Sequence, residues 1–228
     1  MRDDPSTNIR LDEVHLTLGS RRFHFDCGIN EGQVTAVVGP SGSGKSTLLN
    51  LISGFERPDS GRILIDGRDI TELAPAERPI SLVFQDNNLF SHLDLFTNIG
   101  LGIHPGMRLT PADRNAISDA LVRVGLEGYE SRLPGSLSGG ERQRAAFARA
   151  LVRHRPVLLL DEPFAALDPG LRAAMVELLI DLHAETRATI LLVTHDPRDV
   201  HRLAGHVLFI EDGHVLIDAR KDVFLTRG

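Results

Sequence analysis

The sequence predicts an α/β protein built on a parallel β-sheet, and three observations lead to this prediction. Four apolar runs rich in β-branched residues, at 34–38, 80–84, 157–160 and 189–193, have the length and continuity of strands buried on both faces. The run at 34–38 leads through a glycine-rich loop into a predicted helix. A mostly helical segment then separates the second run from the third.

Shorter elements are predicted around this sheet. The dipeptides Asp66-Gly67 and Asp212-Gly213 have the composition of tight hairpin turns, which indicates an antiparallel β region beside the parallel strands. Thr110-Pro111 is a typical helix start, and the apolar face of that predicted helix contains Ile117, Leu121 and Val124.

The loop after the first run, GPSGSGKST at 39–47, fits the pattern G-x-x-x-x-G-K-[ST]. Its glycines allow backbone N–H groups to turn inward around a triphosphate, and the next helix adds its positive N-terminal end. Since one helix dipole contributes only about 0.3–1 kcal/mol, several amides, Lys45 and a metal ion must act together. We expect Lys45 to reach the β- and γ-phosphates of ATP and the Ser46 hydroxyl to bind Mg²⁺. The predicted ATP-binding residues are Gly39, Pro40, Ser41, Gly42, Ser43, Gly44, Lys45, Ser46 and Thr47.

A polar residue suited to phosphate chemistry follows each of the four runs. These residues are Gly39, Gln85, Asp161 with Glu162, and Thr194 with His195. Ligands of parallel sheets collect beyond the carboxyl ends of the strands, so we expect these residues to converge on one site. Taken singly, Gln85 or His195 could be an ordinary satisfied polar residue, and the two carboxylates could be a solvated strand end. Repulsion between adjacent carboxylates nevertheless favours a nearby metal ion.

A second motif, LSGGERQR at 137–144, predicts a capped helix whose start could also contact a phosphate. Ser138 and Glu141 form a capping box, and the helix is expected to run to about residue 153 with its arginines as a solvated face. Gly139 and Gly140 lack side chains, so a phosphate held by a neighbouring copy could approach the amides at the helix end. The arginines of the expected solvated face are Arg142, Arg144, Arg149 and Arg153.

These motifs resemble those of ABC-transporter ATPases and occur in the same order: Walker A at 39–47, Gln85, the LSGG signature, Walker B at 157–163, Asp168 and His195. The resemblance covers nearly the whole chain. It implies the ABC ATPase fold, a P-loop NTPase (RecA-like) parallel-sheet core with an antiparallel β subdomain and a helical subdomain. We expect one domain, 1–228, divided into a core with a β flap at 8–85 and 156–228 and a helical subdomain at 86–155.

The resemblance also implies roles for individual residues. Glu162 would be the general base, and His195 and Gln85 would complete the catalytic group. Ser46, Gln85 and Asp161 would hold Mg²⁺, with Asp161 acting through water. Asp168 would lie at a dimer interface, although Asp168 followed by proline is also a good helix N-cap. The residues expected to contact ATP of the other subunit are Leu137, Ser138, Gly139, Gly140 and Glu141.

Two positions depart from the family pattern. Many members have Gln at the position of Glu141, and because a carboxylate would oppose a γ-phosphate, we expect Glu141 to fold back onto the helix cap. Leu18 stands where members usually have an aromatic ring that stacks on adenine. Phe23 or Phe25 could substitute or could be sent into the core by strand alternation, so we assign no adenine-stacking residue.

The segment 84–106, FQDNNLFSHLDLFTNIGLGIHPG, is similar to the ATPases of bacterial thiamine importers. This similarity implies a homodimer that binds transmembrane permease subunits at the cytoplasmic face of the inner membrane and, through them, an extracytoplasmic substrate-binding protein. The alternatives are an importer for ferric iron, a polyamine or an oxyanion, and a non-transport ABC ATPase of the cell-division type.

Composition limits the remaining possibilities. A formal net charge of −6 argues against a nucleic-acid partner. One cysteine, Cys27, allows no internal disulfide. Ten histidines lack the spacing of metal ligands, so we expect no zinc site. Neither a signal peptide nor an apolar segment of about 20 residues is expected, so a membrane role would come through a partner.

Overall fold

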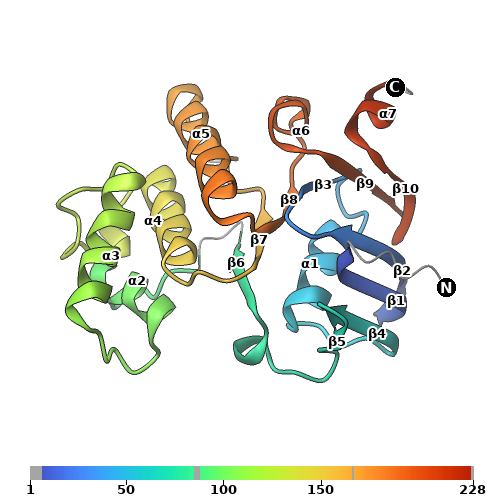
Figure 1. Ribbon diagram of the computed structural model, residues 1–228, viewed down its shortest axis with the longest axis horizontal. Helices are drawn as coiled ribbons and strands as arrows, with labels where there is room; N and C mark the ends of the chain where they lie inside the picture. The colour runs from blue at the N-terminus through green and yellow to red at the C-terminus, as the bar shows by residue number, and fades with distance from the viewer. Residues whose placement is uncertain (1–6, 85–87, 166, 227–228) are drawn as a thin grey trace. The chain divides into compact units, whose positions relative to one another are not determined.

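The computed structural model (Figure 1) describes residues 7–84, 88–165 and 167–226, and these divide into two units. The sheet unit comprises Met1–Ile80, Pro156–Asp161 and Thr186–Gly228. The helical unit comprises Ser81–Arg155 and Glu162–Glu185. Each unit is described by itself below.

The strands of the sheet unit follow the order β5-β4-β1-β2-β10-β9-β3-β8-β7. β3 pairs parallel with β9 and β8, and β8 pairs parallel with β7. β5, β4, β1 and β2 pair antiparallel in that order, as do β9 and β10, whereas β10 pairs parallel with β2. β6 is Ile80–Val83. Its first residue, Ile80, belongs to the sheet unit, and its other residues belong to the helical unit. The strand bounds are β1 Thr7–Leu18, β2 Arg21–Asn30, β3 Val34–Val38, β4 Ser60–Ile65, β5 Arg68–Asp69, β7 Val157–Asp161, β8 Thr189–Val193, β9 His206–Glu211 and β10 His214–Arg220.

Three of the parallel strands that the apolar runs predict, β3, β7 and β8, are confirmed as parallel, and the fourth run forms the strand β6. β3 and β8 have the predicted bounds, β7 extends one residue further to Asp161, and β6 ends one residue earlier. All five residues of β8 are buried, as expected for a strand covered on both faces. Cys27 is also buried on β2, and burial raises the pKa of its thiol to about 12, so it is not a thiolate at neutral pH.

Both predicted hairpin turns are confirmed. Asp66 and Gly67 join β4 to β5 with φ values of 50° and 71°, and Asp212 and Gly213 join β9 to β10 with φ values of 47° and 80°. Positive φ at both central residues is the type I′ geometry that matches the right-handed twist of paired strands. The second turn also contacts the glycine-rich loop at 39–47, called the phosphate loop below, because the Gly213 N–H donates to the Ser43 carbonyl.

A buried arginine closes the C-terminal end of the first helix, α1 (Lys45–Ser53). Arg78 is only 1% exposed, and its guanidinium donates to the carbonyl oxygens of Leu51 and Ile52 at 2.8 Å each. It also donates to Leu73 and Thr71 at 3.0 Å each. Burial lowers the pKa of Arg78, but the four carbonyls solvate its charge. The other helices of this unit are η1 Pro75–Glu77, α6 Pro197–Leu203 and α7 Lys221–Leu225.

We expect Arg78→Met to destabilise the sheet unit because it leaves several buried carbonyl oxygens without donors, at about 1–3 kcal/mol for each unsatisfied group. In thermal unfolding, a loss of about 3 kcal/mol lowers Tm by roughly 6–12 °C in a chain of this size. Arg68→Met, at an exposed position of β5, is the matched control and should leave Tm nearly unchanged. Equal Tm values for the two variants would contradict the capping role of Arg78.

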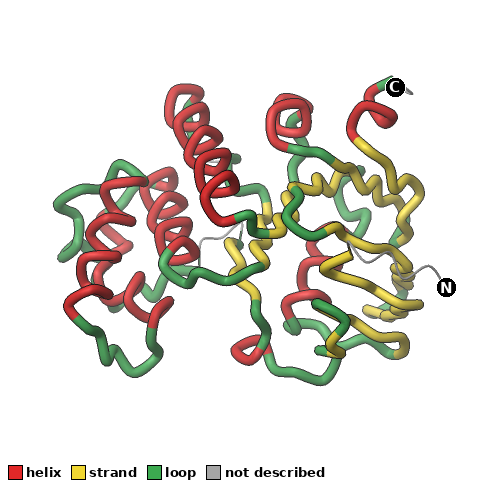
Figure 2. Tube along the Cα trace, in the orientation of Figure 1, coloured by secondary structure: helices red, strands yellow, loops and turns green. Residues whose placement is uncertain are grey.

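The helical unit contains α2 (Leu95–Ile103), α3 (Pro111–Arg123), α4 (Gly139–Leu151) and α5 (Pro169–Thr186), with a short 3₁₀ turn at Pro134–Ser136 (Figure 2). α2, α3 and α4 pack on one another. The predicted start of α3 is confirmed, because Thr110 accepts from the Asp113 N–H and completes a capping box. Its predicted apolar residues, Ile117, Leu121 and Val124, are buried.

The predicted solvated face of α4 is wrong at Arg144. This side chain is only 8% exposed and donates to the carbonyl oxygens of Val124 and Gly125 at 2.8 and 2.9 Å. Arg149 is half-buried and donates to the Asn88 carbonyl, and burial lowers the pKa of both Arg149 and Arg153. Long cationic side chains can cover apolar surface while they bind carbonyls at their tips, which helical periodicity does not reveal. Within the described residues, no helix is both long and apolar enough to cross a membrane.

Candidate functional site

The phosphate loop after β3 requires glycine at two positions. Gly39 has φ 148°, and a Cβ there would lie 2.0 Å from the Ile210 carbonyl oxygen. Gly44 has φ 112°, and a Cβ there would lie 3.0 Å from the Phe23 ring. Since any side chain would collide with the neighbouring strands, the loop is held tightly against the sheet. Across the loop, Ser43 and Gly44 are buried, Gly39, Lys45 and Thr47 are half-buried, and Pro40, Ser41, Gly42 and Ser46 are exposed.

Hydrogen bonds hold the loop in a turn around the Lys45 ammonium. Lys45 Nζ donates to the carbonyl oxygens of Gly39 and Pro40 at 3.0 and 2.8 Å. The Ser43 N–H donates to Pro40 at 3.2 Å, and the Gly213 N–H of the β9–β10 turn donates to the Ser43 carbonyl at 2.9 Å. The loop is therefore held by hydrogen bonds between its own residues and by one from the β9–β10 turn.

Two features of the loop fit a bound anion. The Ser43 hydroxyl is buried and has no hydrogen-bond partner among the described residues, at a cost of about 1–3 kcal/mol for an unsatisfied polar group. α1 begins after Gly44, which has no side chain to cap it, and its first turn contains no acidic residue. The first-turn N–H groups of any helix lack partners within the helix, so a phosphate would supply their acceptor.

A cleft of about 430 Å³ adjoins the loop and is lined by the loop itself, the start of β2 and the β9–β10 turn. Arg21 and Arg22 supply positive charge there, and Arg21 donates to the Gly42 carbonyl at 3.1 Å. Phe23 and Phe25 are 5% and 0% exposed, so both rings pack largely in the core, and Phe23 also lines the cleft. Leu18 remains 39% exposed at the end of β1.

Strand register aligns the ends of β3, β8 and β7 within the sheet unit. Val37 pairs with Val193, and Val193 pairs with Asp161, so the phosphate loop, His195 and Asp161 all follow the same edge of the sheet. Asp161 is half-buried and His195 is exposed. Thr194 is buried and donates to Asp199 at 2.7 Å, which ties the end of β8 to α6. Gln85 lies outside the described residues.

In the helical unit, Glu162 has a backbone conformation that is uncommon for a residue with a side chain. Its φ is 47°, in the left-handed region. Its carbonyl accepts from the buried Gln143 side chain at 3.1 Å and from the Ala165 N–H at 3.2 Å. The sequence motif did not predict this role for Gln143; a polar residue at an inward-facing position of α4 is the signal that could have found it.

The signature begins α4 with the predicted capping box. The Glu141 N–H donates to Ser138 Oγ at 3.2 Å, and the Ser138 N–H donates to Glu141 Oε2 at 2.7 Å. The expectation that Glu141 folds back onto the cap is therefore confirmed. Hydrogen bonds with Ser138 hold the pKa of Glu141 below its usual value, and the bond from the backbone N–H has a larger effect than the bond with the side chain. Leu137 is buried beneath the exposed Ser138, while Gly140 is half-buried.

Packing within the described residues does not explain a glycine at position 139. A Cβ built on Gly139 meets nothing within 4 Å, and its φ is not in the left-handed region. This differs from Gly39 and Gly44, where the chain itself excludes a side chain. The space over the start of α4 is thus open for a group from outside the chain.

Asp168 is the N-cap of α5, as the Asp-Pro sequence predicts. Its carboxylate accepts from the N–H groups of Gly170 and Leu171 at 3.0 Å each. The side chain is exposed. An exposed capping residue can also contact a second molecule.

Comparisons with known proteins match these features across the chain. The family model for ABC transporters matches residues 23–165. Thiamine import ATP-binding protein ThiQ of Rhizobium meliloti is 54% identical over 222 residues, covering 97% of this chain and 93% of the relative. The protein of the same name from Brucella suis is 52% identical and covers 98% of this chain and 92% of its own length.

Solved structures agree. An ATP-binding cassette solved as a dimer in a post-hydrolysis state, bound to ADP and Pi, is 30% identical with a TM-score of 0.84, covering 93% of this chain and 98% of that chain. A nucleotide-free cassette from an ABC transporter is 26% identical with a TM-score of 0.85, covering 97% and 96%. The predicted ABC ATPase fold is confirmed, and the chain belongs to the ABC transporter family as an ATP-binding cassette.

Proposed function

We propose that this protein is the ATP-hydrolysing subunit of an ABC importer that carries thiamine across the inner membrane. The observation that carries the proposal is the identity of 54% over 97% of the chain with a thiamine import ATP-binding protein. The phosphate loop, the aligned strand ends and the capped signature helix supply the parts that ATP hydrolysis needs.

In this proposal, residues 39–47 hold the phosphates of ATP. Lys45 exchanges its bonds to the Gly39 and Pro40 carbonyls for the β- and γ-phosphate oxygens, while the orphaned Ser43 hydroxyl and the first-turn amides of α1 donate to the same anion. Ser46 and Gln85 would hold Mg²⁺ through their side-chain oxygens, and Asp161 would hold it through water. When bound, Mg²⁺ neutralises charge on the β- and γ-phosphates.

The hydrolytic step needs a base and a group that orients water. Glu162 accepts a proton as water attacks the γ-phosphorus, the bond to the β–γ bridging oxygen breaks, and ADP leaves with that oxygen. His195 orients the water and the γ-phosphate, while Gln85 contacts the metal ion and senses the membrane partner. The hydrogen bond from Gln143 fixes the backbone of Glu162, which limits where its carboxylate can lie.

Two copies are needed to complete each site. Leu137–Glu141 of one copy covers ATP held by the loop of the other, and the open space at Gly139 supports this arrangement because none of the described residues comes within 4 Å of a Cβ built there. Asp168, exposed at the start of α5, lies at the interface of the homodimer. The name of one structural neighbour describes a dimer with ADP and Pi.

Transport requires partners in the membrane. We assign 8–85 and 156–228 to the nucleotide-binding core with its β flap and 86–155 to the helical subdomain that binds the permease subunits. The ATPase pair lies peripherally at the cytoplasmic face of the inner membrane and responds, through the permease, to an extracytoplasmic substrate-binding protein. ATP binding and hydrolysis close and reopen the pair, which switches the permease between two access states.

Reconstitution tests the substrate. The ATPase is co-purified with its permease, placed in proteoliposomes and supplied with the substrate-binding protein, and phosphate release is measured with thiamine, ferric iron, a polyamine or an oxyanion. We expect thiamine alone to stimulate ATP turnover. Stimulation by another solute would overturn thiamine but retain the importer, whereas failure to co-purify any permease would overturn the importer itself.

A further inference from the structure

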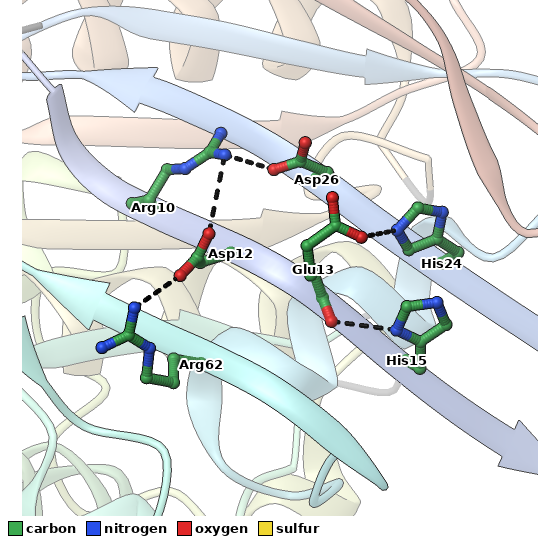
Figure 3. Close-up of polar contacts among 7 residues, drawn as sticks. All are labelled: Arg10, Asp12, Glu13, His15, His24, Asp26 and Arg62. Atoms are coloured by element: carbon green, nitrogen blue, oxygen red, sulfur yellow. Dashed lines mark hydrogen bonds and ion pairs between the residues drawn. The ribbon is translucent and has the colours of Figure 1, made fainter. Parts of the chain in front are cut away.

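Three potential metal ligands that are not among the residues assigned to ATP come together on β1 and β2. Glu13 and His15 are on β1 and His24 is on β2 (Figure 3). Their ligand atoms all lie within 4.8 Å of one another. Sequence spacing does not reveal this group, because nine positions separate His15 from His24 and strand pairing brings them together.

Strand register places the two histidines on the same face of the sheet. His15 and His24 are directly paired across the antiparallel ladder, and their rings are 4.2 Å apart between centroids. Directly opposed residues of an antiparallel pair project to the same side. The two imidazoles therefore form one surface feature with both rings fixed beside each other.

A β-bulge adds the carboxylate to this face. The register shifts between Leu11 and Val14, both of which are buried, so Asp12 and Glu13 project in succession toward solvent. Glu13 has φ 48° at this bulge. A bulge redirects side chains in this way, and it places Glu13 two residues before His15 on the exposed face. Glu13 Oε2 then lies 3.0 Å from His24 Nε2.

The hydrogen bonds of His15 leave one ring nitrogen suited to a metal. His15 Nδ1 lies 2.9 Å from the Glu13 carbonyl oxygen. A carbonyl only accepts, so Nδ1 donates in this contact, and Nε2 is the other ring nitrogen, which could bind a metal. Histidines that bind metals commonly donate their other N–H to a carbonyl or a carboxylate, which fixes the tautomer.

We propose that Glu13, His15 and His24 form a binding site for a divalent transition-metal ion, with Zn²⁺ the best match. Two imidazole nitrogens and one carboxylate oxygen are a ligand set that Zn²⁺ uses, with water in the fourth position. Bonds of 2.0–2.2 Å at a tetrahedral ion put neighbouring ligand atoms about 3.4 Å apart, so side-chain rotations at this surface suffice to close the group. Mg²⁺ prefers oxygen ligands and is not expected here.

The surrounding charges leave the carboxylate of Glu13 available. Arg10, on the same strand, is engaged by Asp26 and Asp12, and Arg62 contacts Asp12 at 2.7 Å (Figure 3). Among the described residues, the ion pair recorded for Glu13 is the one with His24. A metal ion would replace that ion pair and would not have to displace an arginine.

The test measures Zn²⁺ binding by equilibrium dialysis on the full-length chain, purified without a histidine tag and in the absence of nucleotide. We expect one ion for each chain. Glu13→Gln and His24→Gln should each weaken binding by at least the 10–100-fold that losing a partner of a ligand costs. His201→Gln, at an exposed position of α6, is the matched control and should bind Zn²⁺ as the parent does.

Circular dichroism and Mg–ATP turnover without added zinc show whether each variant is folded, and neither should change. Equal Zn²⁺ affinity in the parent and in folded His24→Gln would overturn the site. So would an equal loss in His201→Gln, because that result would indicate general binding by surface histidines.

Discussion

Glu162→Gln should lower ATP turnover by about 10²–10⁴-fold, the usual effect of removing a general base, while ATP binding is retained. Glutamine has nearly the same size and keeps the backbone contacts, in which the Glu162 carbonyl accepts from Gln143 and Ala165. What it loses is the ability to take a proton from water. Phosphate release measures turnover, and equilibrium binding of labelled ATP measures affinity.

Glu127→Gln is the matched control, because it makes the same change at an exposed glutamate of the helical unit. It should hydrolyse ATP at the parent's rate. If Glu162→Gln also turned over near the parent's rate, Glu162 could not be the base. If it failed to bind ATP, the loss of turnover would reflect a damaged site and the assignment would lose its support.

A mixed dimer made of one Ser138→Arg copy and one Lys45→Ala copy should hydrolyse ATP, although neither variant does so as a homodimer. In the shared arrangement, the intact loop of the first copy meets the intact signature of the second, and one complete site results. Each homodimer has two damaged sites, and losing a group that stabilises transition-state charge costs about 10²–10³ in turnover. Phosphate release from co-assembled, differently tagged copies measures the recovery.

The control pairs an unmodified copy with one that carries both substitutions. Sharing between copies predicts that this dimer has no complete site and is inactive, whereas a site formed within one chain predicts that its unmodified copy works alone. The two mixed dimers contain the same substitutions, so a general defect in assembly affects both. Activity in the second dimer but not in the first would refute sharing.

Features that depend on a few neighbouring residues are predictable from the sequence. The two Asp-Gly turns and the caps at Ser138 and Asp168 all occur as expected, because their conformations and hydrogen bonds involve residues within a few positions of each other. The strand β8 is similarly visible as a short apolar run. The order of motifs along the chain then indicates the family, and the comparisons confirm it.

Tertiary structure decides where polar side chains lie when their partners are distant in sequence. The solvated face predicted for α4 fails at Arg144 because carbonyls about twenty positions earlier receive its guanidinium. Arg78 is buried for the same reason, since it closes a helix that ends 25 positions before it. Periodicity reports which face of an element is apolar, but not which distant backbone groups need a donor.

The sequence by itself determined the motif of the phosphate loop and the cap of the signature helix, because local spacing encodes both. Only the folded chain decided that Phe23 packs in the core and that Glu13, His15 and His24 share one surface. The physical reason is strand pairing: a bulge between Leu11 and Val14 sets which residues of β1 face solvent and which residue of β2 each one meets.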